Sequence, residues 1–124
     1  MPHVSAEMRG CIRECQGCAA VCIETATQCL QKGGRHAEAD HIRLLLDCAE
    51  VCQTGANFMP RASDLHALTC GVCAEVCERC AADCERMADD EMMRRCGETC
   101  GRCAESCRRM AGGAAGSGRM AAAA

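Results

Sequence analysis

The sequence is organised around a cysteine repeat, C-x3-C-x2-C-x3-C, whose spacing matches one face of an α-helix. The repeat occurs at residues 11–22, 73–84 and 96–107, and half of it occurs at residues 48–52. Steps of three, four and seven residues return to the same side of a helix, so the cysteines of each repeat fall within an arc of about 60–80°. Cysteine therefore takes the place of the apolar stripe that a helix normally buries.

Composition supports an interior built from sulfur. The chain has 16 cysteines among its 124 residues, whereas Leu, Ile, Val and Phe together number 15. A composition this poor in large apolar side chains is typical of disordered chains when net charge is high, but the net charge here is only −3. An aliphatic core is excluded, and cysteine must contribute much of the packing.

Breakers and capping residues divide the chain into four helical segments. Ser5 and Ser63 are candidate N-caps, Gly33-Gly34 ends the first segment, and Asp89 or Asp90 can cap the last. No segment alternates with period two, so no strand is predicted. The predicted helices cover residues 5–32, 35–58, 63–88 and 90–111.

Short links between these helices favour antiparallel neighbours. The predicted fold class is therefore all-α: an antiparallel up-down-up-down four-helix bundle with a cysteine-lined core. It forms one metal-binding domain over residues 1–111, followed by a disordered Gly/Ala-rich tail over residues 112–124.

Several functions are disfavoured. With one aromatic residue and a mildly acidic balance, the chain lacks the basic patches and stacking rings that bind nucleic acid. No apolar run is long enough to cross a membrane, and no export signal is seen, so a reducing cytoplasm is the expected compartment. No nucleophile–base pair, paired carboxylates or phosphate loop indicates an enzyme.

Metal binding is the interpretation that best explains the cysteines, because packing alone would leave a thin, oxidation-prone core. A column of thiolates with helix-fixed spacing suits a soft, low-coordinate ion such as Cu(I). About 16 Cu(I) ions, each held by two bridging thiolates, would neutralise 16 buried thiolates, whereas divalent ions would fill at about half that number. The predicted ligands are Cys11, Cys15, Cys18, Cys22, Cys29, Cys48, Cys52, Cys70, Cys73, Cys77, Cys80, Cys84, Cys96, Cys100, Cys103 and Cys107.

Two alternatives remain open. The first is a zinc or cadmium buffer with a metallothionein-like role. The second is a redox protein that stores disulfides, although i,i+4 pairs on one helix strain disulfide geometry. Metal competition separates the first alternative from copper binding, and a thiol count on protein isolated without reductant separates the second.

Through its three full repeats, the chain resembles the bacterial four-helix-bundle copper storage proteins, specifically their cytosolic branch without a signal peptide. This resemblance covers residues 5–111 and implies storage or detoxification of many Cu(I) ions by a homo-oligomer, expected to be a tetramer. Release would need competing ligands, protonation or a partner such as a copper chaperone or an efflux protein. Two helices depart from the family pattern, which affects the expected copper capacity. The second helix has only Cys48 and Cys52, and the first has Thr25 or Ala26 where a further cysteine could lie between Cys22 and Cys29.

Methionine and histidine continue the cysteine stripes at both ends of the expected bundle. Both side chains suit copper, and thioether favours Cu(I). The hypothesis is that one or both ends admit copper, the alternative being ordinary core filling by Met. His3 and His36 are expected to be exposed. One end would hold Met8, Met59, His66 and Met110, and the other Cys29, His41, Met87 and Met92.

Overall fold

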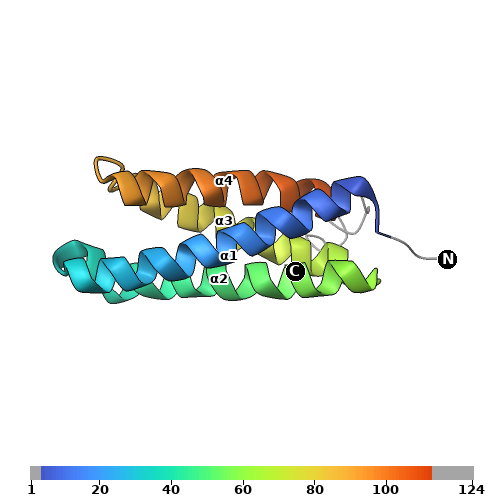
Figure 1. Ribbon diagram of the computed structural model, residues 1–124, viewed down its shortest axis with the longest axis horizontal. Coiled ribbons are helices and arrows are strands. Elements are labelled where there is room, and N and C mark those ends of the chain that lie inside the picture. The colour runs from blue at the N-terminus through green and yellow to red at the C-terminus, as the bar shows by residue number, and fades with distance from the viewer. Residues whose placement is uncertain (1–3, 113–124) are drawn as a thin grey trace.

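The computed structural model describes residues 4–112, which form a four-helix bundle with no β-strand among them (Figure 1). Two short 3-10 turns, η1 (Gly34–Ala37) and η2 (Met59–Arg61), lie in the connections. The predicted all-α bundle is confirmed, and its helices are α1 (Ala6–Lys32), α2 (Ala39–Phe58), α3 (His66–Glu85) and α4 (Glu91–Gly112).

The chain reverses direction at each connection, which gives the predicted up-down-up-down topology (Figure 1). Helices α1 and α3 each pack against both α2 and α4. The α1–α2 and α3–α4 connections therefore share one end, here called the turn end. The start of α1, the α2–α3 connection and the last turn of α4 share the other, here called the termini end.

Two predicted caps are present. The Ser5 side chain accepts a hydrogen bond from the Met8 backbone N–H at 3.1 Å, and Asp90 Oδ1 accepts from the backbone N–H groups of Met92 and Met93 at 3.0 and 3.2 Å. Each satisfies backbone donors that a helix start leaves unpaired.

Two helices begin later than predicted. Gly33 and Gly34 have φ values of 75° and 58°, and the chain then makes η1 before α2 begins at Ala39. Ser63 Oγ accepts from the Leu65 backbone N–H at 3.1 Å, so Ser63 stabilises a turn and α3 begins at His66.

The core is a column of small and sulfur-containing side chains. All sixteen cysteines are buried, with Ala, Met and the fully buried Leu45 around them. Gly97 of α4 lies against α3, where an added Cβ would be 3.5 Å from Cys84 Cβ. None of the helices described here combines the length and apolarity needed to cross a membrane. Apart from Gly112, which ends α4, the predicted tail lies outside the described residues.

Candidate metal centre

The cysteine sulfurs form a continuous path along the bundle axis. It runs from Cys11 to Cys107, 3.8 Å apart, and on to Cys15 at 3.4 Å. Further steps of 3.5–3.9 Å lead through Cys103, Cys52, Cys77, Cys48 and Cys100 to Cys22. All four helices contribute, so an ion bound at one thiolate has further thiolates within reach.

Four overlapping groups of four thiols have all their sulfur atoms within 4.8 Å of one another. Each group is buried and draws on at least three helices, and shared cysteines link neighbouring groups. Soft thiolates at this spacing can bridge several monovalent soft ions. The groups are Cys15/Cys73/Cys103/Cys107, Cys52/Cys73/Cys77/Cys103, Cys18/Cys48/Cys52/Cys77 and Cys18/Cys22/Cys48/Cys100.

Burial and mutual hydrogen bonding control the proton affinity of the thiols. Hydrogen bonding with Cys80 and Cys96, together with burial, raises the pKa of Cys84. In the centre, a hydrogen bond from Cys100 lowers the pKa of Cys48, and hydrogen bonding with Cys18, Cys22 and Cys48 raises the pKa of Cys100. Neighbouring thiols therefore share protons, and a thiol with a raised pKa loses its proton to an incoming metal rather than to water.

At the turn end, Cys29 lies among three further potential metal ligands. The Cys29 thiol lies 3.4 Å from His41 Nε2 and 3.6 Å from Met93 Sδ, all three buried. His36, expected to be exposed, is half-buried with Nδ1 3.9 Å from Cys29 Sγ. Thiol, imidazole and thioether thus meet at one place, a donor set that suits copper.

Asp83 orients His41. His41 Nδ1 donates to Asp83 Oδ2 at 2.5 Å, and its other ring nitrogen, Nε2, faces Cys29 Sγ at 3.4 Å. Burial raises the pKa of Asp83, but hydrogen bonds from His41 and Arg86 outweigh it and hold that pKa below its usual value. A carboxylate behind an imidazole is the arrangement that fixes histidine as a metal ligand.

Sequence reasoning missed Met93 and Asp83. Met92, predicted for the turn end, is half-buried and lines a pocket with Thr25, whereas Met93 contacts Cys29. Met93 and Met92 lie three and four residues before Cys96, so both are close to the cysteine stripe of α4. Only the rotation of α4 in the bundle decides which of them faces Cys29. Asp83 gives no motif, because its partner lies 42 residues away.

The predicted residues of the termini end differ in burial. Met59 and Met110 are buried, whereas Met8 and His66 are half-buried. His66 Nδ1 donates to the Ser63 carbonyl at 2.9 Å. Met87, predicted for the turn end, is buried.

The remaining cysteines, Cys70, Cys80, Cys84 and Cys96, are buried on the same helix faces as the rest. All sixteen are free thiols in this structure, and the closest hydrogen-bonded pair of sulfurs, Cys15 and Cys107, is 3.4 Å apart.

Comparison with known proteins gives a consistent result. Residues 4–112 match the family described as copper storage protein. The Nmul_A1745 protein of Nitrosospira multiformis has a similar structure, with 46% identity and a TM-score of 0.80 over 86% of this chain and 95% of that one.

Two similar solved structures contain bound copper. Copper storage protein BsCsp3 of Bacillus subtilis, Cu(I)-bound, is 32% identical with a TM-score of 0.79, covering 85% of this chain and 98% of that one. A cytosolic copper storage protein from Streptomyces lividans, with five coppers, is 31% identical with a TM-score of 0.75, covering 86% of this chain and 92% of that one.

A curated relative matches over a shorter stretch. The uncharacterized cysteine-rich protein YhjQ of Bacillus subtilis (strain 168) is 34% identical over 66 residues, which are 53% of this chain. The match spans 61% of that relative, less than two thirds of its length.

Proposed function

The chain belongs to the copper storage protein family, and on that premise we propose that it stores Cu(I) at about one ion per cysteine, all sixteen serving as ligands. The observation that supports this most directly is the unbroken path of buried sulfur contacts from Cys11 to Cys22. Each ion can move to the next thiolate without leaving the core.

Charge balance favours a monovalent cargo. Sixteen buried thiolates without counter-ions would be prohibitively unfavourable, and one Cu(I) per thiolate gives a neutral interior. Sixteen divalent ions would leave sixteen excess positive charges. The zinc or cadmium alternative therefore requires about half as many ions.

The Cys29, His41 and Met93 group is an outer copper site. A surface pocket lined by Glu38, Asp40, His41 and Arg86 opens beside His41, and copper would approach the group from this side. The sequence-predicted ligands His66, Met8, Met59, Met87, Met92 and Met110 would act only as accessory thioether or imidazole donors.

The role proposed is sequestration without catalysis in the cytosol, the compartment of the copper storage protein from Streptomyces lividans. Cysteine protons leave as Cu(I) binds, and the ion is kept from water and oxygen. Release requires competing ligands, protonation, or a copper chaperone or efflux protein as partner.

Self-association into a homo-oligomer, expected to be a tetramer, is also proposed. Six large apolar side chains are roughly half exposed, a large share of the 15 in the sequence. Such side chains on a small domain favour protein–protein contact. Sedimentation of the apo chain tests this, and a monomer at all concentrations would contradict it. The six are Ile23, Leu30, Leu46, Leu65, Leu68 and Val72.

Metal competition on the reduced chain tests the cargo. Loaded anaerobically with Zn(II) and then given Cu(I), the protein is expected to lose its zinc, because thiolate sites bind Cu(I) more strongly. The copper-loaded form is expected to keep its copper in excess zinc. Retention of zinc against Cu(I) would support the zinc or cadmium buffer instead.

A thiol count addresses the redox alternative. Protein is isolated without reductant under anaerobic conditions, and a chelator then removes its copper. Nearly all of its cysteines are expected to react as free thiols in the assay. A low count that only reduction restores would favour a disulfide store.

A further inference from the structure

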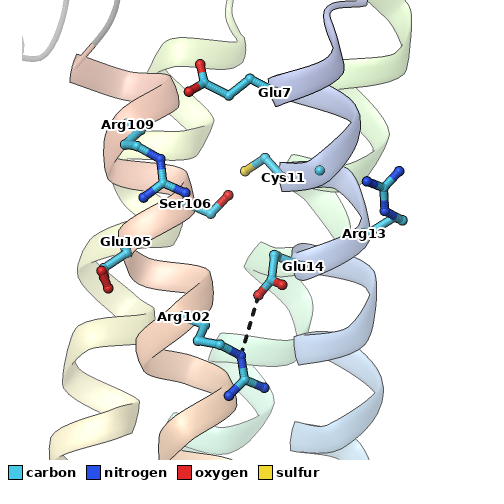
Figure 2. A pocket seen from close by; sticks show the side chains of 9 residues that line it. Glu7, Cys11, Arg13, Glu14, Arg102, Glu105, Ser106 and Arg109 are labelled. Carbon is cyan, nitrogen blue, oxygen red and sulfur yellow. Dashed lines mark ion pairs between the residues drawn. The ribbon is translucent and has the colours of Figure 1, made fainter.

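The side of the bundle between α1 and α4 has a pocket of about 470 Å³ near the termini end (Figure 2). Cys11 of α1 and Ser106 of α4 line its inner wall, with Gly10 beside them. Gly10 has no side chain and Ser106 a small one, so no bulky group there separates the pocket from the sulfur column. Cys11 itself is fully buried and closes the pocket floor.

Cys11 is the first sulfur of the continuous path. Its Sγ lies 3.8 Å from that of Cys107, and Cys107 lies 3.4 Å from Cys15. Copper accepted at Cys11 therefore has a second thiol at hand and a route into the column.

The rim of the pocket offers charges of both signs (Figure 2). Glu14 and Arg102 form a loose ion pair at 4.0 Å between α1 and α4. Within residues 4–112, neither Arg13 nor Arg109 has a carboxylate partner in an ion pair. Glu7 and Glu105 likewise have no cationic partner in that part of the chain.

Ser106 adds a polar group inside the pocket. It is only 6% exposed, and its hydroxyl lies beside Cys11. The hydroxyl is hydrogen-bonded to the Cys11 thiol. Ser106 therefore helps to hold the Cys11 thiol in place at the floor of the pocket.

We propose that this pocket docks a small thiol that carries Cu(I) and bears both carboxylate and ammonium groups. The proposal rests on the proposed function, because it names the donor that supplies the store. Arg13 and Arg109 would bind the carboxylates, Glu7 or Glu105 the ammonium group, and the carrier's copper would face Cys11. A pocket of this volume suits a ligand of amino-acid to tripeptide size, and not a protein domain.

The transfer step balances without a redox partner. Cu(I) arrives as a monoanionic two-coordinate centre, bound to the thiolate of the docked carrier and to the thiolate of a second carrier molecule outside the pocket. Cys11 and then Cys107 form Cu–S bonds as the two carrier Cu–S bonds break. Each cysteine proton passes to a leaving carrier thiolate, so two neutral carrier thiols depart and copper stays Cu(I).

The test compares two copper donors on the full reduced chain, using Cu(I)–glutathione and Cu(I) in acetonitrile, a ligand without charge. In the double variant Arg13→Ala and Arg109→Ala, loading from Cu(I)–glutathione is expected to slow on the order of tenfold. Loading from Cu(I)–acetonitrile is expected to stay within about twofold, with unchanged final capacity. The matched control, Arg9→Ala with Arg79→Ala, removes two exposed arginines outside the pocket and is expected to load normally from both donors.

Equal slowing with both donors, or no slowing with Cu(I)–glutathione, would overturn the proposal. Neither result would contradict copper storage, because the final copper capacity of the chain is measured separately. S-Methylglutathione gives a second test, since it keeps the charged groups but cannot bind copper as a thiolate. It is expected to compete with Cu(I)–glutathione for loading of the parent chain and not of the Arg13/Arg109 variant. Absence of competition with the parent chain would also contradict docking.

Discussion

His41 is the residue that most clearly distinguishes the two ends of the bundle. It is 2% exposed, held by Asp83 on one side and facing Cys29 on the other. His66 at the opposite end is half-buried and engaged with the Ser63 carbonyl. The two histidines therefore have different expected roles, although both continue a cysteine stripe in the sequence.

Replacing His41 by Ala should slow copper loading by about tenfold, because the outer site loses its imidazole donor. Asp83→Asn should slow it less, since the ring remains but is less firmly oriented. Anaerobic stopped-flow absorbance of the copper–thiolate bands measures both. His66→Ala is the matched control, and an equal slowing in that variant would contradict the assignment of the outer site to the turn end.

Copper affinity should rise with pH between about pH 6 and pH 8. Burial raises the pKa of Cys29, and hydrogen bonding with Cys80 and Cys96, with burial, raises that of Cys84. These thiols are protonated throughout that range, so each Cu(I) that binds must displace protons, and acid opposes binding. Competition with a chelator of known pH dependence checks this, and an affinity independent of pH would contradict it.

Single residues show where sequence reasoning reached its limit. The spacing placed all sixteen cysteines on buried faces, and the structure agrees. The choice between Met92 and Met93, and the partnership of His41 with Asp83, depend on how α3 and α4 rotate against their neighbours. Neither is encoded in local periodicity.

At the scale of helices, α4 approaches α3 closely at Gly97. An added Cβ there would lie 3.5 Å from Cys84 Cβ and 3.6 Å from the Ala81 carbonyl oxygen, which is ordinary contact distance. Gly101, one turn later, has no atom within 4 Å of its Cβ position. Of these two glycines, only Gly97 is a point of close approach between helices.

Gly97→Leu should therefore lower the stability of the apo bundle by about 1–3 kcal/mol, because a large side chain must push α3 and α4 apart. Gly97→Ala should be neutral or stabilising, since alanine favours the helix. Thermal unfolding followed by circular dichroism measures both changes. Gly101→Leu is the control, and a loss there as large as at Gly97 would contradict the packing described.

The periodicity of the sequence predicted the four helices and their order. It did not predict the residues at which α2 and α3 begin. The region around Gly33-Gly34 reads equally as a helix end or as a short link, and the structure inserts η1 before Ala39. Ser63 has the residue type of an N-cap but stabilises a turn two residues further on. Both choices depend on how the chain must turn to bring the next helix back onto the bundle.

At the scale of the whole molecule, the interior is held by small side chains and sulfur, and Leu45 is the only fully buried leucine within residues 4–112. Hydrophobic burial is correspondingly modest. Metal bound only by the folded chain adds its binding free energy to stability.

The copper-loaded protein should therefore unfold at a temperature higher than the apo form by at least about 10 °C. Circular dichroism at matched protein concentration under anaerobic conditions measures the difference. Equal midpoints would mean that copper does not bind in the core of the folded bundle.

The sulfur column is proposed to store copper in bulk. An anaerobic titration of the reduced apo-protein with Cu(I), against a strong chromophoric chelator, measures this capacity. Protein is quantified by thiol assay, since the chain has no Trp or Tyr. Tight uptake of on the order of 16 ions per chain is predicted, one for each buried thiolate, and saturation at one or two ions would contradict storage.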